Sequence, residues 1–590
     1  MKTTRRLGLV LALIVGAAWL APLPAGALPA GTPKTGLVCT PGAVSGSTHT
    51  FRLVANAGHI QTPDGNHILM WSYAVAGADD PTNLWPDFQS PGPVLCVTQG
   101  ETVEVQLHSV LPEPTSIVFP GQDAPVTAAG GLAGLFTNEA SGSNDVTYSF
   151  TATNPGTYLY ESGSNVSKQV EMGLYGALIV RPSAGANLAY GTTTQFDPGH
   201  EFLLLLAEID PDLHHAVETG GTYDFTKLHN HYFTVNGRSF PDTLQDNGSN
   251  LLPTQPYGAL VRIPSHIAQP ALIRMLNAGT DNHPFHPHGN HTREIAQDGR
   301  LLLAPGGARA STERFGETIG SGQTKDYLLT WDETDGFNPV TKPFPVAQPN
   351  YRNLTFKDGV TWYSGSPYIG YQGTLPTGTV SLNVCGEWYF PLHSHALNEF
   401  TNFDEPFGGM ATLLRVDPAG GCFAFPTSTA IISGGGTLNG GTFKNLGVDD
   451  TLYYRVNSTT TGSARSTNWY GQFTGIPKGS ANLAVTYKGR NCGTGAGCPF
   501  TANKATSVFI WNWATASWGA APLATGSIGS ASDTTIGPTA VPGSPSATSW
   551  ANYIGTGTNK GRVRIRIFTQ GTTTSFVTGG NLMKLVYDAP

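Results

Sequence analysis

Short runs of alternating apolar and polar residues recur along the chain and predict β-strands. The run 102–107 alternates with a period of two, as expected of a strand with one buried face. The run 562–567 alternates in the same way near the C-terminus. Gly (73 residues) and Pro (43 residues) are abundant and favour turns between such runs. The pattern therefore predicts an all-β protein built from sandwiches or barrels.

The strand pattern divides the chain into three segments. Residues 45–182 form the first and end in a continuous apolar strand. Residues 200–416 repeat the scheme, and within them 333–379 is rich in Pro, Gly and Tyr, which indicates an insertion or covering loop. Residues 424–590 are rich in Gly, Ser and Thr, contain no histidine, and predict a C-terminal β-sandwich.

The first 27 residues are typical of an export signal. Lys2, Arg5 and Arg6 precede an apolar run at 7–20, and Ala25–Ala27 provides small residues for cleavage. The positive start also matches part of a twin-arginine signal. No second run is long enough to span a bilayer. We therefore expect an exported protein without a transmembrane segment, in the periplasm, outside the cell or at the cell surface.

Charge and cysteine content narrow the classes further. Charged residues are 12% of the chain and the net charge is -8, so we expect a weakly acidic surface and no nucleic-acid partner. Six cysteines in an exported chain predict disulfides, although six allow 15 pairings. Only the pair Cys492 and Cys498 is predicted here, because a short, Gly-rich loop joins them.

Two histidine clusters in the second segment predict a metal site. On a strand, residues two apart share a face, so each cluster can present two imidazoles together. Two such pairs on neighbouring strands would converge four nitrogen ligands, and imidazole suits copper, zinc, iron or nickel. The alternative is surface or hydrogen-bonded histidine, but two pairs in one domain favour a metal. The four candidate ligands are His286, His288, His393 and His395.

Other polar residues nearby are weaker candidates. Glu399, Asp404 and Glu405 could add oxygen ligands or orient an imidazole, but a solvated loop is the favoured interpretation. A third His-x-His, at 229–231, belongs to neither cluster, and the adjacent pair at 214–215 would face opposite sides of a strand. We expect neither to bind a metal.

The sequence around these histidines resembles the multicopper oxidases. The run from His283 to Gly289 (His-Pro-Phe-His-Pro-His-Gly) is very similar to a motif whose first histidine binds the blue copper and whose next two bind the trinuclear copper cluster. The run 393–395 (His-Ser-His) resembles the family's C-terminal His-Cys-His. The resemblance covers about 45–416. It implies two cupredoxin-like Greek-key β-barrel domains, a copper cofactor, and His283 as a further metal ligand.

Several residues that the family needs are absent. Where the family has His-Trp-His-Gly, this chain has Val118-Phe119-Pro120-Gly121. Where it has Tyr-His-Ser-His, this chain has Tyr160-Glu161-Ser162-Gly163. The blue-copper thiolate is replaced by Ser394 and its partner histidine by Glu399. The resemblance therefore implies neither a blue copper site nor a complete trinuclear cluster.

These residues leave three functions open. The first is an exported oxidoreductase that uses a non-blue copper site on a small molecule or metal ion. The second is a copper-binding protein without turnover, and the third is a surface or structural protein attached through residues 424–590. The resemblance also implies a homotrimer as one assembly. Six aromatic residues of the last segment (Trp469, Tyr470, Trp511, Trp513, Trp518 and Trp550) could contact carbohydrate, although sheet core and edge positions are favoured.

Overall fold

The computed structural model describes residues 32–588 with internal breaks. The breaks are 77–87, 265–268, 332–387, 404, 407, 418–421, 448, 496–497, 543–549 and 572. The expected export signal and the insertion at 333–379 lie outside the described residues. Only two α-helices, α1 (Val166–Gln169) and α2 (Pro211–Thr219), occur in the described part, and the remaining regular structure is strands and short 3-10 turns. The predicted all-β fold is confirmed.

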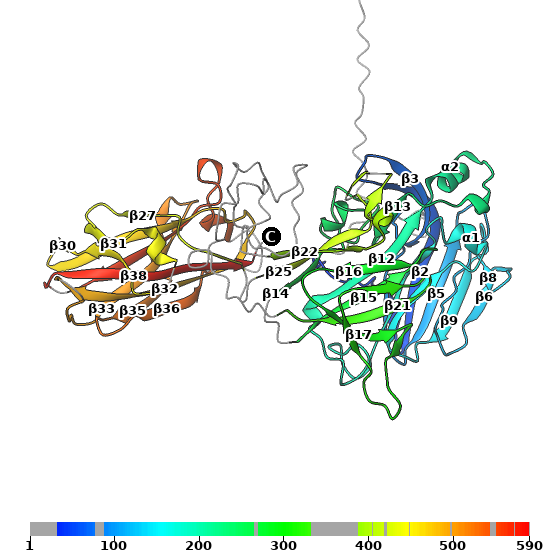
Figure 1. Cartoon of the computed structure of the whole chain (residues 1–590), viewed down its shortest axis with the longest axis horizontal. Coiled ribbons are helices and arrows are strands. Elements are labelled where there is room, and N and C mark those ends of the chain that lie inside the picture. The colour runs from blue at the N-terminus through cyan, green and yellow to red at the C-terminus, as the bar shows by residue number, and fades with distance from the viewer. Residues whose placement is uncertain are drawn as a thin grey trace, which may run out of the picture.

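Domain 1 contains a six-stranded and a three-stranded sheet around one core (Figure 1). The larger sheet consists of β1 (Ala43–Ser45), β2 (Thr48–Gln61), β3 (His67–Val75), β5 (Thr102–Ser109), β6 (Thr127–Gly130) and β9 (Val146–Thr151). The smaller consists of β4 (Leu95–Thr98), β10 (Gly156–Glu161) and β11 (Tyr175–Arg181), beside a β7 (Leu132–Ala133) and β8 (Asn138–Glu139) hairpin. The predicted alternation of β5 is observed, since every second residue is buried.

Domain 2 repeats this arrangement with a seven-stranded and a five-stranded sheet. The first consists of β12 (Glu201–Ile209), β13 (Tyr232–Val235), β15 (Ala271–Asn277), β17 (Thr292–Gln297), β18 (Arg300–Leu301), β19 (Thr312–Arg314) and β21 (Thr324–Leu329). The second consists of β14 (Val261–Pro264), β16 (His283–Pro287), β20 (Glu317–Ile319), β22 (Trp388–Ser394) and β25 (Ala411–Asp417). A two-stranded sheet of β23 (Thr401–Asn402) and β24 (Glu405–Pro406) is attached.

The two domains use the same strand pairings. A parallel pair lies in each larger sheet, β2 with β5 and β12 with β15. In the smaller sheets, β10 pairs antiparallel with β11, which runs parallel to β4. Likewise β22 pairs antiparallel with β25, which runs parallel to β14. Each of these strands of domain 1 therefore has a counterpart in domain 2.

A shared apolar cluster and buried ion pairs join domains 1 and 2. Leu159 and Ile179 of domain 1 pack with Leu205 and Leu276 of domain 2. Beside them, Arg181 of domain 1 donates to the buried Glu201 of domain 2 at 2.7 Å, and the fully buried Arg274, also of domain 2, donates to the same carboxylate at 2.7 Å.

The C-terminal segment is a sandwich of a six-stranded and a seven-stranded sheet, drawn in yellow to red in Figure 1. The first consists of β26 (Cys422–Ala424), β28 (Thr437–Gly440), β29 (Tyr454–Asn457), β32 (Ala481–Gly493), β36 (Thr534–Ala540) and β38 (Phe576–Asp588). The second consists of β27 (Ser428–Ile431), β30 (Thr459–Thr461), β31 (Ala464–Phe473), β33 (Lys504–Asn512), β34 (Ser517–Trp518), β35 (Ala524–Ile528) and β37 (Val563–Gln570). Trp469 and Trp550 are buried in its core.

Three further expectations can be compared with the structure. The predicted disulfide Cys492–Cys498 is present, and Cys39–Cys96 is a second one that joins residues 57 apart in sequence. The pair 214–215 lies on α2 and not on a strand, because Asp210 caps the helix and Pro211 begins it. None of the described helices is long and apolar enough to cross a membrane.

Candidate metal centre

Two neighbouring strands of domain 2 bring the candidate histidines together. β16 and β22 pair antiparallel, and His286 lies directly opposite His393. His288 and His395 follow the ends of these strands, and their backbone N–H groups continue the ladder to Pro391 and Pro284 at 2.9 and 2.8 Å. Because side chains alternate across a sheet, all four imidazoles project from the same face. The predicted convergence of the two His-x-His pairs is therefore observed.

The four imidazole rings form one contiguous cluster. The ring centroid of His286 lies 4.8, 5.6 and 5.2 Å from those of His288, His393 and His395. The closest nitrogens, Nε2 of His288 and Nε2 of His393, are 3.1 Å apart. Two nitrogens at 2.0–2.1 Å from a tetrahedral ion would be about 3.3 Å apart. The spacing of this one pair is therefore close to that of two nitrogens bound to the same ion.

A backbone hydrogen bond orients the most buried of these rings. His393 Nδ1 donates to its neighbour's carbonyl, Ser394 O, at 2.7 Å, so Nε2 carries the free lone pair that faces the cluster. Burial, together with the adjacent His288, lowers the pKa of His393 to about 4. Burial and neighbouring histidines also lower the pKa values of His286 and His288. Neutral imidazole is the form that binds a metal, and these three rings favour it near pH 7.

The cluster opens into a cavity of about 580 Å³. His286, His288 and Phe315 line it, and the side chain of Phe315 is 62% exposed. On the other side, the ring of Phe400 stacks on His393 at 4.6 Å. The imidazoles are therefore accessible from solvent while one of them is packed against an aromatic ring.

The donor atoms of these side chains determine which kinds of metal site they can form. Within the described ranges, no three His, Cys, Asp or Glu side chains already stand in a metal-binding arrangement. The four imidazoles nevertheless supply enough nitrogen donors for one copper ion once their rings turn. A blue copper site needs a thiolate beside two histidines, and Ser394 supplies a hydroxyl instead. The residues thus fit an imidazole-bound ion and do not fit a blue copper.

His283 occupies the position where the family's blue copper would take its first histidine, and it is fully buried between two carboxylates. Its Nε2 donates to Glu208 at 3.0 Å and its Nδ1 donates to Glu399 at 2.9 Å. Glu399 also accepts a short hydrogen bond from Ser394. Although burial alone would lower it, the two carboxylates raise the pKa of His283 to about 9. His283 is therefore a protonated imidazolium at neutral pH.

This network bears on two expectations. Both ring nitrogens of His283 are hydrogen-bonded to carboxylates here, and its role as a metal ligand stays a prediction. Glu399 is 4% exposed and is not part of a solvated loop. Asp404 lies outside the described residues, as does the side chain of Glu405. Sequence reasoning missed Glu208, although a carboxylate within the apolar run 202–209 indicates a buried partner.

The equivalent positions of domain 1 carry no imidazoles but have the same backbone arrangement. Val118 and Glu161 form a β-bridge, with N–H to O distances of 2.8 and 3.2 Å, as His286 and His393 do in domain 2. A Cβ added at Gly163 would lie 2.6 Å from the Val118 side chain, so this position is closed. Val118 and Glu161 thus form the same kind of backbone pairing as His286 and His393, without imidazoles.

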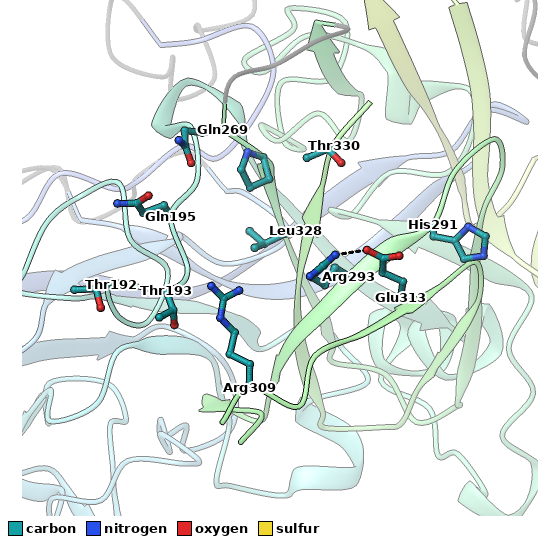
Figure 2. Close-up of a pocket in the computed structure, with 11 residues that line it drawn as sticks. Thr192, Thr193, Gln195, Gln269, His291, Arg293, Arg309, Glu313, Leu328 and Thr330 are labelled. Carbon is teal, nitrogen blue, oxygen red and sulfur yellow. Dashed lines mark hydrogen bonds and ion pairs between the residues drawn. The ribbon is translucent and has the colours of Figure 1, made fainter. Parts of the chain in front are cut away.

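The remaining polar candidates do not join the cluster. The rings of His229 and His231 are 4.3 Å apart, and His231 stacks on Phe403. A separate polar pocket of about 310 Å³, shown in Figure 2, shares His291 with the larger cavity. In it, Arg293 pairs with Glu313.

Comparison with known proteins supports the family resemblance. Residues 81–185 match the family model of a multicopper oxidase domain. A multicopper oxidase of Cercospora beticola is 35% identical over 92 residues, which are 15% of this chain and 14% of that protein. A protein of Oryza sativa subsp. japonica named as a laccase is 26% identical over 291 residues, which are 48% of each chain. The matched segments thus span less than half of these relatives.

One solved structure is similar at lower identity. The blue copper oxidase from Nitrosomonas europaea is 18% identical, with a TM-score of 0.41, and the match covers 62% of this chain and 85% of that one. The family model matches domain 1, which lacks the histidines, whereas the imidazole cluster lies in domain 2. The match to the family model at residues 81–185 confirms the predicted resemblance to the multicopper oxidases, a family that implies copper as the cofactor.

Proposed function

We propose that this chain is an exported copper-binding protein that holds copper through His286, His288, His393 and His395, at a site without a thiolate. The observation that carries the proposal is the register of β16 and β22, which sets His286 opposite His393 and gathers four imidazoles, two of which line an open cavity. Copper bound there would supply a redox centre or a Lewis acid.

The protein residues define what such a site can do. The backbone hydrogen bond of His393 holds its Nε2 toward the cluster, which supports binding of a metal by a neutral ring. The cavity beside Phe315 admits a small molecule to the imidazoles. We therefore propose an oxidoreductase activity on a small molecule or metal ion. The non-catalytic alternative is copper binding alone, which the missing cluster ligands of domain 1 favour.

A ligand replacement in the full chain tests the proposal. The double variant His286→Ala/His393→Ala should weaken copper binding by about 100-fold or more, because two of four ligands are lost. The matched control, His229→Ala/His231→Ala, should change the Kd less than threefold. Affinity is measured by competition with a chelator of known strength. Equal losses in the two variants would place the copper elsewhere.

The spectrum of the copper-loaded chain gives a second readout. Because Ser394 replaces the thiolate, the intense absorption near about 600 nm that a Cu–thiolate bond produces should be absent. Electron paramagnetic resonance should show nitrogen couplings that disappear in the double variant. An intense blue colour would contradict the proposed ligand set and point to a cysteine ligand.

Export is tested separately. Sequencing of the mature N-terminus should find cleavage after the small-residue segment Ala25–Ala27. Retention of the first 27 residues in the mature protein would exclude this part of the proposal.

A further inference from the structure

The C-terminal sandwich differs sharply in charge from the rest of the chain. Residues 424–590 contain twelve Lys and Arg, four Asp and no Glu. Residues 1–423 contain 20 Lys and Arg and 36 Asp and Glu. The overall charge of -8 is therefore the sum of a basic C-terminal domain and an acidic remainder of the chain. The expected weakly acidic surface does not hold for the C-terminal domain.

Two arginines of this basic domain lie on the outer face of its seven-stranded sheet. Along β37 the aliphatic residues are buried, whereas Arg564 and Arg566 alternate with them on the half-exposed side. Register sets Arg566 opposite Tyr470 and Arg564 opposite Gln472 on β31. The arginines are thus built into the centre of a sheet face and not into a loop.

Aromatic rings flank both guanidinium groups. Arg564 lies 5.2 Å from the ring centroid of Tyr470 and 4.8 Å from that of Trp513. Arg566 lies 5.9 Å from the ring of Trp518. The rings of Trp511 and Trp518 are 5.1 Å apart, so the aromatic residues form one half-exposed surface. Stacked guanidinium groups of this kind are held in a fixed orientation.

The charge of these two arginines is not neutralised within the domain. Their Nε atoms donate to neutral amides, Arg564 to Gln472 at 2.8 Å and Arg566 to Asn468 at 2.7 Å. The ion pairs of the sandwich join other residues, Lys488 with Asp449 and Arg490 with Asp533. Across the described residues, no carboxylate lies within ion-pair distance of either arginine. The remaining guanidinium N–H groups are therefore available to an external anion.

We propose that this arginine–tryptophan face binds an acidic polysaccharide, a chain of sugars that carry carboxylates. The tryptophan and tyrosine rings offer surfaces for the apolar faces of sugars, and the guanidinium groups match carboxylates in geometry and charge. A duplex nucleic acid would call for several more phosphate contacts than two arginines provide. The acidic polymer would hold the chain at a surface, independently of copper in domain 2.

Affinity electrophoresis of the full chain tests this proposal with polygalacturonate as the probe. Polygalacturonate should retard the chain, whereas a neutral glucan should not. The variant Arg564→Gln/Arg566→Gln should weaken binding at least tenfold. The control Arg455→Gln/Lys478→Gln removes the same charge from two exposed residues outside this face and should change binding less than twofold.

A measurement on the unaltered chain guards against misfolding of the variant. Titration with galacturonate oligomers should shift the tryptophan emission, because three tryptophans lie on the face, and neutral oligomers should not. The proposal is overturned if polygalacturonate neither retards the chain nor shifts its emission. Equal weakening in the two double variants would show that binding depends on net charge alone and would overturn the proposal. Tighter binding of duplex DNA through the same arginines would identify nucleic acid, and not a polysaccharide, as the ligand.

Discussion

Domains 1 and 2 share one backbone arrangement at the copper-motif positions but fill it in opposite ways. In domain 1, Val118 bridges Glu161, and in domain 2, His286 pairs with His393. Each of these strand segments also carries a glycine with positive φ, Gly121 at 81° and Gly289 at 86°. The fold therefore tolerates both sets of side chains, and it alone does not determine whether metal ligands are present.

The residues behind the two sites show what replaces a ligand. In domain 1, Ser162 donates to the neutral Gln169 at 2.7 Å. In domain 2, the equivalent Ser394 donates to Glu399, which is ionically paired with His283. The serine of domain 1 thus has a neutral side-chain partner, whereas in domain 2 a buried ion pair lies behind the imidazole cluster. Mutations should therefore have small effects in the first and large effects in the second.

The largest expected effect concerns oxygen. Four-electron reduction in this family requires a blue copper beside a trinuclear cluster, and domain 1 supplies none of its four cluster histidines. We expect the copper-loaded chain to reduce oxygen with phenolic or dye substrates at a negligible rate, with peroxide as the product of any residual turnover. An oxygen electrode with a peroxide assay measures both. Brisk uptake without peroxide would contradict the ligand comparison.

The buried network should give the next largest effect. His283→Ala leaves the buried Glu208 and Glu399 without their cation and should destabilise domain 2 by about 3–5 kcal/mol. Its domain 1 counterpart, Ser162→Ala, removes neutral hydrogen bonds to Gln169 and to the Ser164 backbone and leaves no buried charge unpaired, so it should cost only about 1–2 kcal/mol. Denaturant titrations compare the two variants. Similar losses in both would show that the domains do not differ as described.

The same network predicts a pH dependence. The pKa of His283 is about 9 in the folded chain, above its value of about 6.5 in an unfolded one, so protonation favours folding. This contribution is complete below about pH 6.5 and is lost as the pH rises through about 9. The free energy of unfolding of domain 2 should fall by on the order of 1–3 kcal/mol between these limits. A variant at the exposed His59 should show the same decline, and a flat profile would argue against the raised pKa.

The smallest effect tests whether domain 1 can regain ligands. Val118→His/Glu161→His would set two imidazoles opposite each other, as His286 and His393 are now. We expect a second copper site at least tenfold weaker than the first, because two nitrogen ligands replace four. Isothermal titration with copper should show one additional weak binding step in the variant that is absent from the native chain. If copper bound at the new pair as tightly as at the first site, two nitrogen ligands would be sufficient and the prediction would be wrong.

The sequence by itself determined the features that depend on local periodicity. Alternation predicted the strands, and spacing by two placed His286 with His288 and His393 with His395. The short loop between Cys492 and Cys498 was enough to predict their disulfide. The absence of the family's ligands could be identified at each position of the sequence. Each of these properties involves residues within a few positions of each other, so no knowledge of packing was required.

Only the tertiary structure decided how distant segments meet. His283 and Glu399 are 116 residues apart in the sequence, so the sequence does not reveal their contact. Glu208 comes from yet another segment, β12. The facing of His286 with His393 and the row of Arg564 and Arg566 among aromatic rings likewise depend on strand register. Register is set by burial of whole faces and not by any one residue, because a slip by one position would exchange the buried and exposed sides.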